Sequence, residues 1–186
     1  YVSLLNYLTY SPEILEVIEN KDMDRYTAYE QYTEVVDPLL TVPKSYHDAI
    51  LGIQLFAESI PVRHEYTLVP LDEMCGEWWS SKLDGSVMAQ WIVDRDNRQI
   101  AAVREIYNGK KRDAVLCITL DYEKVFRPLA NIIERNSGGI VVDKQKNVVY
   151  HGENLAASDI SAQKSTEKML DRLREEYAYV STSGHE

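Results

Sequence analysis

The spacing of apolar residues changes near residue 50, and this change constrains the fold more than any other feature of the sequence. Over residues 1–20 and again over residues 24–40, apolar side chains recur at helical spacing. From Ile50 onwards the spacing becomes that of alternating strands. Helices followed by a run of strands predict an α+β fold, because a parallel sheet would need helices between its strands.

Two helices are expected in the first twenty residues. Residues 11–13 read Ser-Pro-Glu, the order of an N-cap, a first helical proline and a first-turn acid. The first helix is therefore expected to end near Tyr10, and the second to run to Asn20. A third helix is expected over residues 24–40, and Pro43 leaves its end undefined.

The strands are predicted to form an antiparallel sheet. Their expected ranges are 50–58, 65–69, 87–93, 99–107 and 113–120. Residues 94–97 form a turn, and Asn108-Gly109 indicates a hairpin of the primed type. Residues 72–81 are expected to form a helix or a packed loop.

The end of the chain predicts a second, smaller unit. A helix is expected over residues 122–136, and a hairpin follows it, with strands at 140–142 and 148–150. Another helix is expected at 161–176 and one more strand at 177–180. We therefore expect a larger domain over residues 1–136 and a smaller, incomplete one over residues 137–186.

One long segment carries a resemblance to a known family. Residues 87–133 read VMAQWIVDRDNRQIAAVREIYNGKKRDAVLCITLDYEKVFRPLANII. In Trp91, Ile100, Arg104, Ile106 and residues 114–121 this segment resembles the extracytoplasmic Cache-type sensor regions of bacterial sensor histidine kinases. The resemblance is greatest to the Gram-positive group paired with AraC-like regulators. The hairpin at residues 140–151 is similar to the opening of that family's second, membrane-proximal unit.

The resemblance implies a fold and a function. The fold would be N-terminal helices and a PAS-like antiparallel sheet of Cache type, then a second PAS-like module. The function would be ligand sensing on the extracellular face of the cell membrane, by a two-component sensor histidine kinase. The ectodomain of a chemoreceptor or of a diguanylate cyclase is the alternative. A small cytosolic α+β enzyme that uses Cys75 or carboxylates is a third possibility.

A ligand pocket of such a sheet would have aromatic walls and a few polar anchors. The residues expected to line it are Trp78, Trp79, Trp91, Arg104 and Tyr107. Arg104 lies in an otherwise apolar strand, where a guanidinium can hold a ligand carboxylate with two hydrogen bonds. The other interpretation is a structural salt bridge to Glu105, to Asp94 or to a helix acid. At least one tryptophan of the pair is expected to be core packing instead.

The sequence gives little support for nucleic-acid binding, metal or cofactor binding, or catalysis. The net charge is −10, and residues 1–48 hold nine acids and three bases, which disfavours a nucleic-acid partner. Four scattered histidines and two cysteines in no ligand spacing predict neither a metal site nor a cofactor. We expect Cys117 to be a buried free thiol, although a bridge to Cys75 stays open. No nucleophile or phosphate-binding motif occurs, so no catalytic residue is predicted.

Two further expectations concern partners and the membrane. Six of the 13 tyrosines lie in residues 1–32, so the N-terminal helices could pack against a twin or against their own sheet. No run of about 20 apolar residues is present, as a membrane-spanning helix would need. Because the chain begins at Tyr1 without methionine, we expect an excised fragment whose membrane anchors lie outside it.

Overall fold

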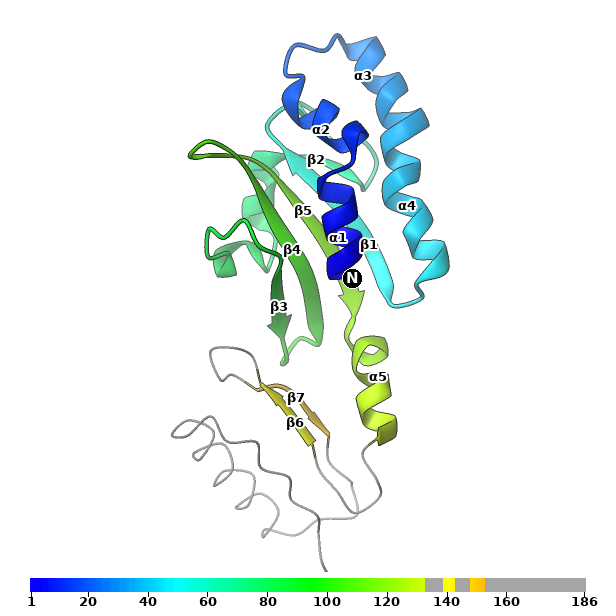
Figure 1. The fold of residues 1–186 in the computed structure, drawn as a ribbon, viewed down its shortest axis with the longest axis vertical. Coiled ribbons are helices and arrows are strands. Elements are labelled where there is room, and N and C mark those ends of the chain that lie inside the picture. Colours follow the sequence, from blue (N-terminus) through cyan, green and yellow to red (C-terminus); the bar gives the residue numbers. More distant parts are fainter. Residues whose placement is uncertain (133–138, 143–147, 153–186) are drawn as a thin grey trace, which may run out of the picture. The chain divides into compact units, whose positions relative to one another are not determined.

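A computed structural model describes residues 1–132, 139–142 and 148–152, and it has the expected α+β fold (Figure 1). The helices that come first are α1 (Val2–Thr9), α2 (Pro12–Glu19), α3 (Arg25–Gln31) and α4 (Asp37–Tyr46). The main sheet contains β1 (Ile50–Ala57), β2 (Leu68–Pro70), β3 (Gln90–Asp94), β4 (Gln99–Asn108) and β5 (Lys111–Asp121). Then follow α5 (Tyr122–Ile132), β6 (Gly139–Val142) and β7 (Val148–Gly152).

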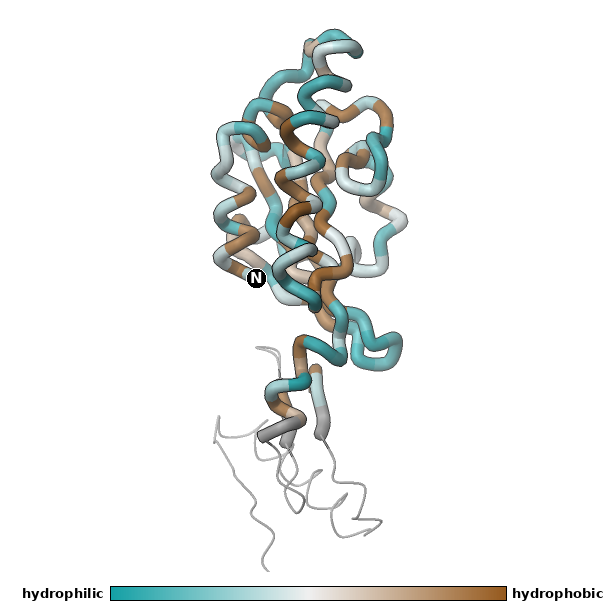
Figure 2. The backbone as a smooth tube through the Cα atoms, turned by 90° about the vertical axis from the view of Figure 1, so that its right-hand side faces the viewer, coloured by the Kyte–Doolittle hydropathy of each residue, from teal (hydrophilic) through white to brown (hydrophobic). Residues whose placement is uncertain are grey.

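The predicted boundary between the first two helices is confirmed. Ser11 has extended backbone angles, and its Oγ accepts a hydrogen bond of 3.3 Å from the N–H of Ile14. This bond satisfies one of the amide groups that a helix leaves without an intrahelical partner. Figure 2 shows hydrophilic and hydrophobic residues alternating along the helices, as expected of elements that bury one side.

The third helical segment is longer than its proline residues suggested. A π-helical turn at Tyr32–Val36 joins α3 to α4, and α4 continues past Pro43 to Tyr46. A proline removes one backbone hydrogen bond. Val36 and Leu40 are almost completely buried, and their packing holds this segment against the sheet.

The sheet is mixed rather than wholly antiparallel. Its strand order is β2-β1-β5-β4-β3, and β1, β3, β4 and β5 form antiparallel pairs. The pair β1–β2 is parallel, with Leu55 opposite Leu68. The alternation of apolar residues shows which side chains share a face, but it does not show the direction of the neighbouring strand.

Two segments near the sheet differ from expectation in their bounds. The third strand begins only at Gln90, because residues 84–88 form tight turns. The N–H of Ser86 donates to Asp84 Oδ1 at 2.9 Å, and the N–H of Met88 donates to Ser86 Oγ at 3.1 Å. Before them, the packed loop consists of two 3-10 turns, η2 (Leu71–Gly76) and η3 (Ser80–Lys82).

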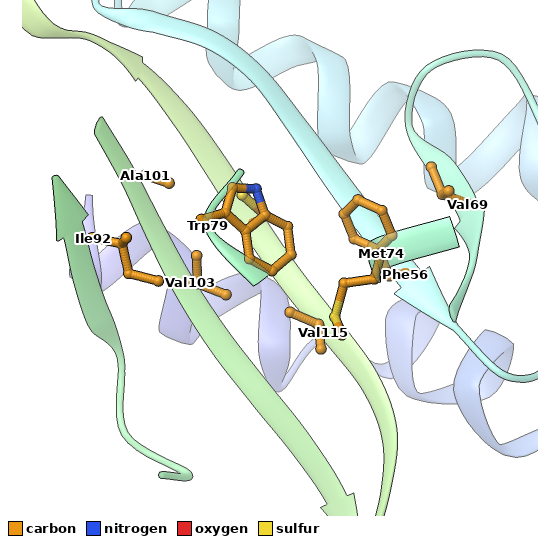
Figure 3. Packing of buried hydrophobic residues seen from close by; sticks show 9 residues of the cluster. Phe56, Val69, Met74, Trp79, Ile92, Ala101, Val103 and Val115 are labelled. Atoms are coloured by element: carbon orange, nitrogen blue, oxygen red, sulfur yellow. The ribbon is translucent and has the colours of Figure 1, made fainter. Parts of the chain in front are cut away.

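The two faces of the sheet are covered by different parts of the chain. Helices α1 and α4 pack on one face, which we call the helix-covered face. The 3-10 turns pack on the other, the loop-covered face, together with a cluster of apolar side chains (Figure 3). The cluster comprises Phe56, Val69, Met74, Trp79, Ile92, Ala101, Val103, Val115 and Cys117. The expectation of a buried free thiol at Cys117 is confirmed.

The chain divides into two compact units. One contains residues 1–94 and 98–122, and the other contains residues 95–97 and 123–186. In the second unit, β6 and β7 pair antiparallel, so the predicted hairpin is confirmed. The rings of Phe126 and Tyr150 stack with centroids 4.6 Å apart. The helix expected at 161–176 and the strand expected at 177–180 lie outside the described residues, and the division at residue 136 stays a prediction.

None of the helices in the described part of the chain is both long enough and apolar enough to cross a lipid bilayer.

An ion cluster at one end of the sheet gives the first testable prediction. The Lys111 ammonium, and after it the Lys21 ammonium, hold the pKa of the Glu58 carboxyl at about 2, below its usual 4.5. Lys21 Nζ lies 2.5 Å from Glu58 Oε2 and 3.4 Å from Asp113 Oδ1. Since the folded state lowers this pKa, Glu58 contributes stability above pH 4.5 that is lost as the pH falls towards 2.

Urea unfolding of the wild type and of Glu58→Gln tests this contribution. The variant should be less stable than the wild type at pH 6, and the difference should shrink steadily below pH 4.5. A difference that stays constant from pH 6 to pH 2 would show that the ionised carboxylate is not its cause.

Candidate ligand-binding site

The five residues predicted to line one pocket lie on two different faces of the sheet. Trp91 pairs with Ala102 across β3 and β4, and Arg104, two residues further along β4, shares that face. This is the helix-covered face, where Arg104 contacts α1. Trp78 and Trp79 pack on the loop-covered face. Tyr107 lies two positions after Glu105 on β4, so it shares this face, and its hydroxyl donates a hydrogen bond to Glu105 Oε2.

Arg104 links β4 to the first helix. Its Nη1 donates to Asn6 Oδ1, and its Nη2 donates to the hydroxyl of Tyr10 at 2.7 Å. The guanidinium carbon also lies 4.9 Å from the centroid of the Tyr10 ring. Both partners, Asn6 of α1 and Tyr10 at its C-cap, are neutral groups rather than the acids that the sequence offered as alternatives. Arg104 is only 9% exposed, and its buried guanidinium is hydrogen-bonded to neutral acceptors alone at this contact.

An open groove lies beside this contact. It has a volume of about 470 Å³ and is lined by Ser3, Asn6 and Tyr7 of α1, by Tyr10 at the C-cap of that helix, and by residues 11–13 at the start of α2. Ser3, Asn6, Tyr7 and Tyr10 are spaced three or four positions apart, so they share one side of the helix. Asn6 and Tyr10 therefore belong both to the groove and to the contact with Arg104.

Trp91 takes no part in this groove. Its side chain is 44% exposed, and its ring meets the Tyr1 ring edge-on with centroids 6.1 Å apart. Arg104 and Trp91 thus share a face of the sheet but contact different parts of the N-terminal segment.

On the loop-covered face, one tryptophan of the predicted pair is core packing. Trp79 is fully buried, and its ring meets Phe56 edge-on with centroids 5.5 Å apart (Figure 3). Its Nε1 has no hydrogen-bond partner among the described residues. Trp78 is half-buried, and Lys82 Nζ lies 5.2 Å from the centroid of its ring.

A buried carboxylate, which the sequence suggested only as a salt-bridge partner of Arg104, lies on the same face. The Glu105 side chain is 1% exposed and accepts three hydrogen bonds. The donors are Gln90 Nε2 at 3.3 Å, the Tyr107 hydroxyl at 3.0 Å and Arg112 Nη1 at 2.8 Å. Burial, and after it the bond to Glu105, raise the pKa of Tyr107. An acid and an arginine on the two strands of one hairpin were the signal that could have indicated this pair.

The cysteine and histidine side chains that were considered for catalysis or metal binding lie in different surroundings. Cys75 is exposed, while Cys117 is buried, and burial raises the pKa of its thiol. The ring of His64 lies edge-on to both Tyr29 and Tyr32. Within residues 1–132, 139–142 and 148–152, no group of three or more His, Cys, Asp or Glu side chains is placed to hold a metal ion.

No family model matches the chain, and no curated protein matches it in sequence. Among solved structures, the chain is similar to the sensory domain of the Campylobacter jejuni chemoreceptor Tlp3 (CcmL), determined with isoleucine bound. The two are 13% identical, the match covers 90% of this chain and 77% of that one, and the TM-score is 0.47. A likeness of this degree says nothing about the function or the ligand of this chain.

The Glu105–Arg112 pair yields a prediction on stability. Arg112→Ala should destabilise the protein by about 2 kcal/mol, because it removes the one charged donor of a buried carboxylate that keeps two neutral donors. Arg63→Ala is the matched control: it removes a 2.7 Å ion pair with Glu73 whose partners are 41% and 42% exposed. An exposed pair contributes less than about 1 kcal/mol. Equal losses for the two variants, measured by urea unfolding at pH 7, would mean that Glu105 is solvated.

Proposed function

We propose that this chain is the ligand-sensing domain of a membrane-bound sensor histidine kinase, on the extracellular face of the membrane. The observation that carries the proposal is the position of Arg104. This residue belongs to the segment that resembles the Cache sensors, and its guanidinium is buried next to an open groove of about 470 Å³. A buried charge that contacts the lining residues of an open groove is typical of a binding site for a small molecule.

The order of elements also supports the proposal. The resemblance implies helices first, then a sheet, then a helix that leads into a second hairpin. The chain has α1–α4, the five-stranded sheet, α5 and the hairpin β6–β7 in this order. The strands that carry the resemblance, β3, β4 and β5, are three of the five strands of the main sheet and contain the candidate residues Trp91, Arg104 and Tyr107.

The contact between Arg104 and α1 suggests how binding is transmitted. In the family, the first helix leads out of the membrane, and here that end of the chain is held by Asn6 and Tyr10 against β4. A ligand in the groove touches the residues that make this contact. It shifts the position of α1 if it binds more tightly to one arrangement of the contact than to another.

Two alternatives share the sensing role. A chemoreceptor or a diguanylate cyclase would use the same domain with another output domain. The third possibility, an enzyme that uses Cys75 or carboxylates, has less support: Cys75 is exposed and is not among the residues that line the groove. Apolar spans on both sides of residues 1–186 in the full-length protein would support a receptor, and continuous polar sequence on both sides would exclude it.

A homodimer through the N-terminal helices stays a prediction. Tyr7 on α1 and Tyr26 and Tyr29 on α3 are largely exposed, so their rings are available to a twin. The excess of acids in residues 1–48 opposes such an association at low ionic strength.

A thermal-shift screen of the purified chain tests the proposal. The library should contain organic acids, amino acids, sugars and amines. A ligand that binds only the folded state adds ~2.7 kcal/mol of stability at 100 times its dissociation constant. We expect at least one class of compound to raise the melting temperature and to be recovered unchanged by mass spectrometry. Conversion of a stabilising compound into a product would contradict a pure sensor, and so would the absence of any stabilising compound.

A further inference from the structure

We propose that the groove between α1 and α2 binds a small monocarboxylate through hydrogen bonds from Asn6 and Tyr10, which Arg104 orients. This inference rests on the proposed sensing function and names the ligand class of the site. It also changes the role that the sequence suggested for Arg104. The guanidinium acts behind the site as a positioning group, and the side chains of Asn6 and Tyr10 contact the ligand.

The argument begins with hydrogen-bond polarity. An arginine side chain has only donors, so the Asn6 atom that meets Nη1 must be the acceptor Oδ1. The amide nitrogen Nδ2, with its two N–H groups, then lies on the other side of the Asn6 amide. The Tyr10 oxygen likewise accepts from Nη2, so its own hydrogen points elsewhere. Both side chains line the groove. Their groups that are not engaged by Arg104, the Asn6 N–H groups and the Tyr10 O–H, are hydrogen-bond donors.

The charge of Arg104 also favours a carboxylate as the ligand. Its guanidinium is buried and its two partners are neutral, so its positive charge is not cancelled at the contact. A fixed positive charge of this kind, itself buried behind the wall of the groove, attracts an anion to it. The hydroxyls of Ser3 and Tyr7 on the same wall can also donate.

The acidic residue of the groove sets a limit on the ligand. Glu13, half-buried in the first turn of α2, lines the groove together with the donors. A ligand with one carboxylate at Asn6 and Tyr10 can keep its uncharged end towards Glu13. A dicarboxylate of similar length would place its second negative charge near Glu13, where like charges repel. The site therefore favours monocarboxylates.

The direct test is an NMR titration of the whole chain with sodium lactate, at an ionic strength held constant with sodium chloride. Lactamide, which has the shape of lactate without its charge, is the control ligand. Lactate should shift the side-chain amide signals of Asn6 and the ring signals of Tyr10, and lactamide should not.

Three variants refine this test. Asn6→Asp keeps the acceptor for Arg104 but replaces the donors by a negative charge, so it should stay folded and lose lactate affinity by about tenfold or more. Glu13→Gln should strengthen succinate binding several-fold and change lactate binding less. Tyr26→Phe alters a tyrosine that is about as exposed as Tyr10 but lies outside the groove, and this variant should bind lactate like the wild type.

Several results would overturn the groove assignment. These are an unchanged lactate affinity in Asn6→Asp, equal shifts with lactamide, and no shift at Asn6 or Tyr10 up to about 0.1 M lactate. A different ligand found in the thermal-shift screen that binds Asn6→Asp as it binds the wild type would overturn the groove and leave sensing intact. Lactate bound in the groove of a protein without membrane spans would keep the groove and remove the receptor.

Discussion

The contact between Arg104 and α1 is the interaction on which the helix-covered side of this protein depends. An eight-residue helix is not stable alone in water, so α1 must take its stability from packing. Leu5 and Leu8 are fully buried and supply the apolar part of that packing. Apolar contacts are not directional, however, and the two hydrogen bonds to Asn6 and Tyr10 select one position of the helix along β4.

The two faces of the sheet solve the problem of a buried charge in opposite ways. On the loop-covered face, Glu105 is matched by Arg112 and by two neutral donors, so the charge is balanced within the protein. On the helix-covered face, Arg104 has only neutral partners. A balanced pair is typical of structure, and an unbalanced charge beside an open groove is typical of binding. This difference is why the candidate site lies next to α1 rather than among the tryptophans.

Local signals predicted local structure well. The Ser-Pro-Glu order at residues 11–13 placed the N-cap of α2, and Asn108-Gly109 placed a turn in which Gly109 has a φ of 62°. The hairpin β6–β7 follows from two β-branched runs around a polar turn. Contacts between distant residues could not be predicted in this way. Asn6 lies 98 residues from Arg104, and the spacing of apolar residues does not identify the partner of a polar side chain. The parallel direction of β2 could not be predicted either. The alternation of apolar residues shows which face of the sheet a side chain lies on, but not which strand is its neighbour or in which direction that strand runs.

A double-mutant cycle between Asn6 and Arg104 tests the central claim most directly. The single variants Asn6→Ala and Arg104→Met and the double variant are compared with the wild type by urea unfolding at pH 7. If the side chains interact as the structure shows, the sum of the two single-variant losses exceeds the loss measured for the double variant by about 1–3 kcal/mol. A coupling energy close to zero would mean that Arg104 does not hold α1, and it would contradict both the fold of the helix-covered side and the site built on it.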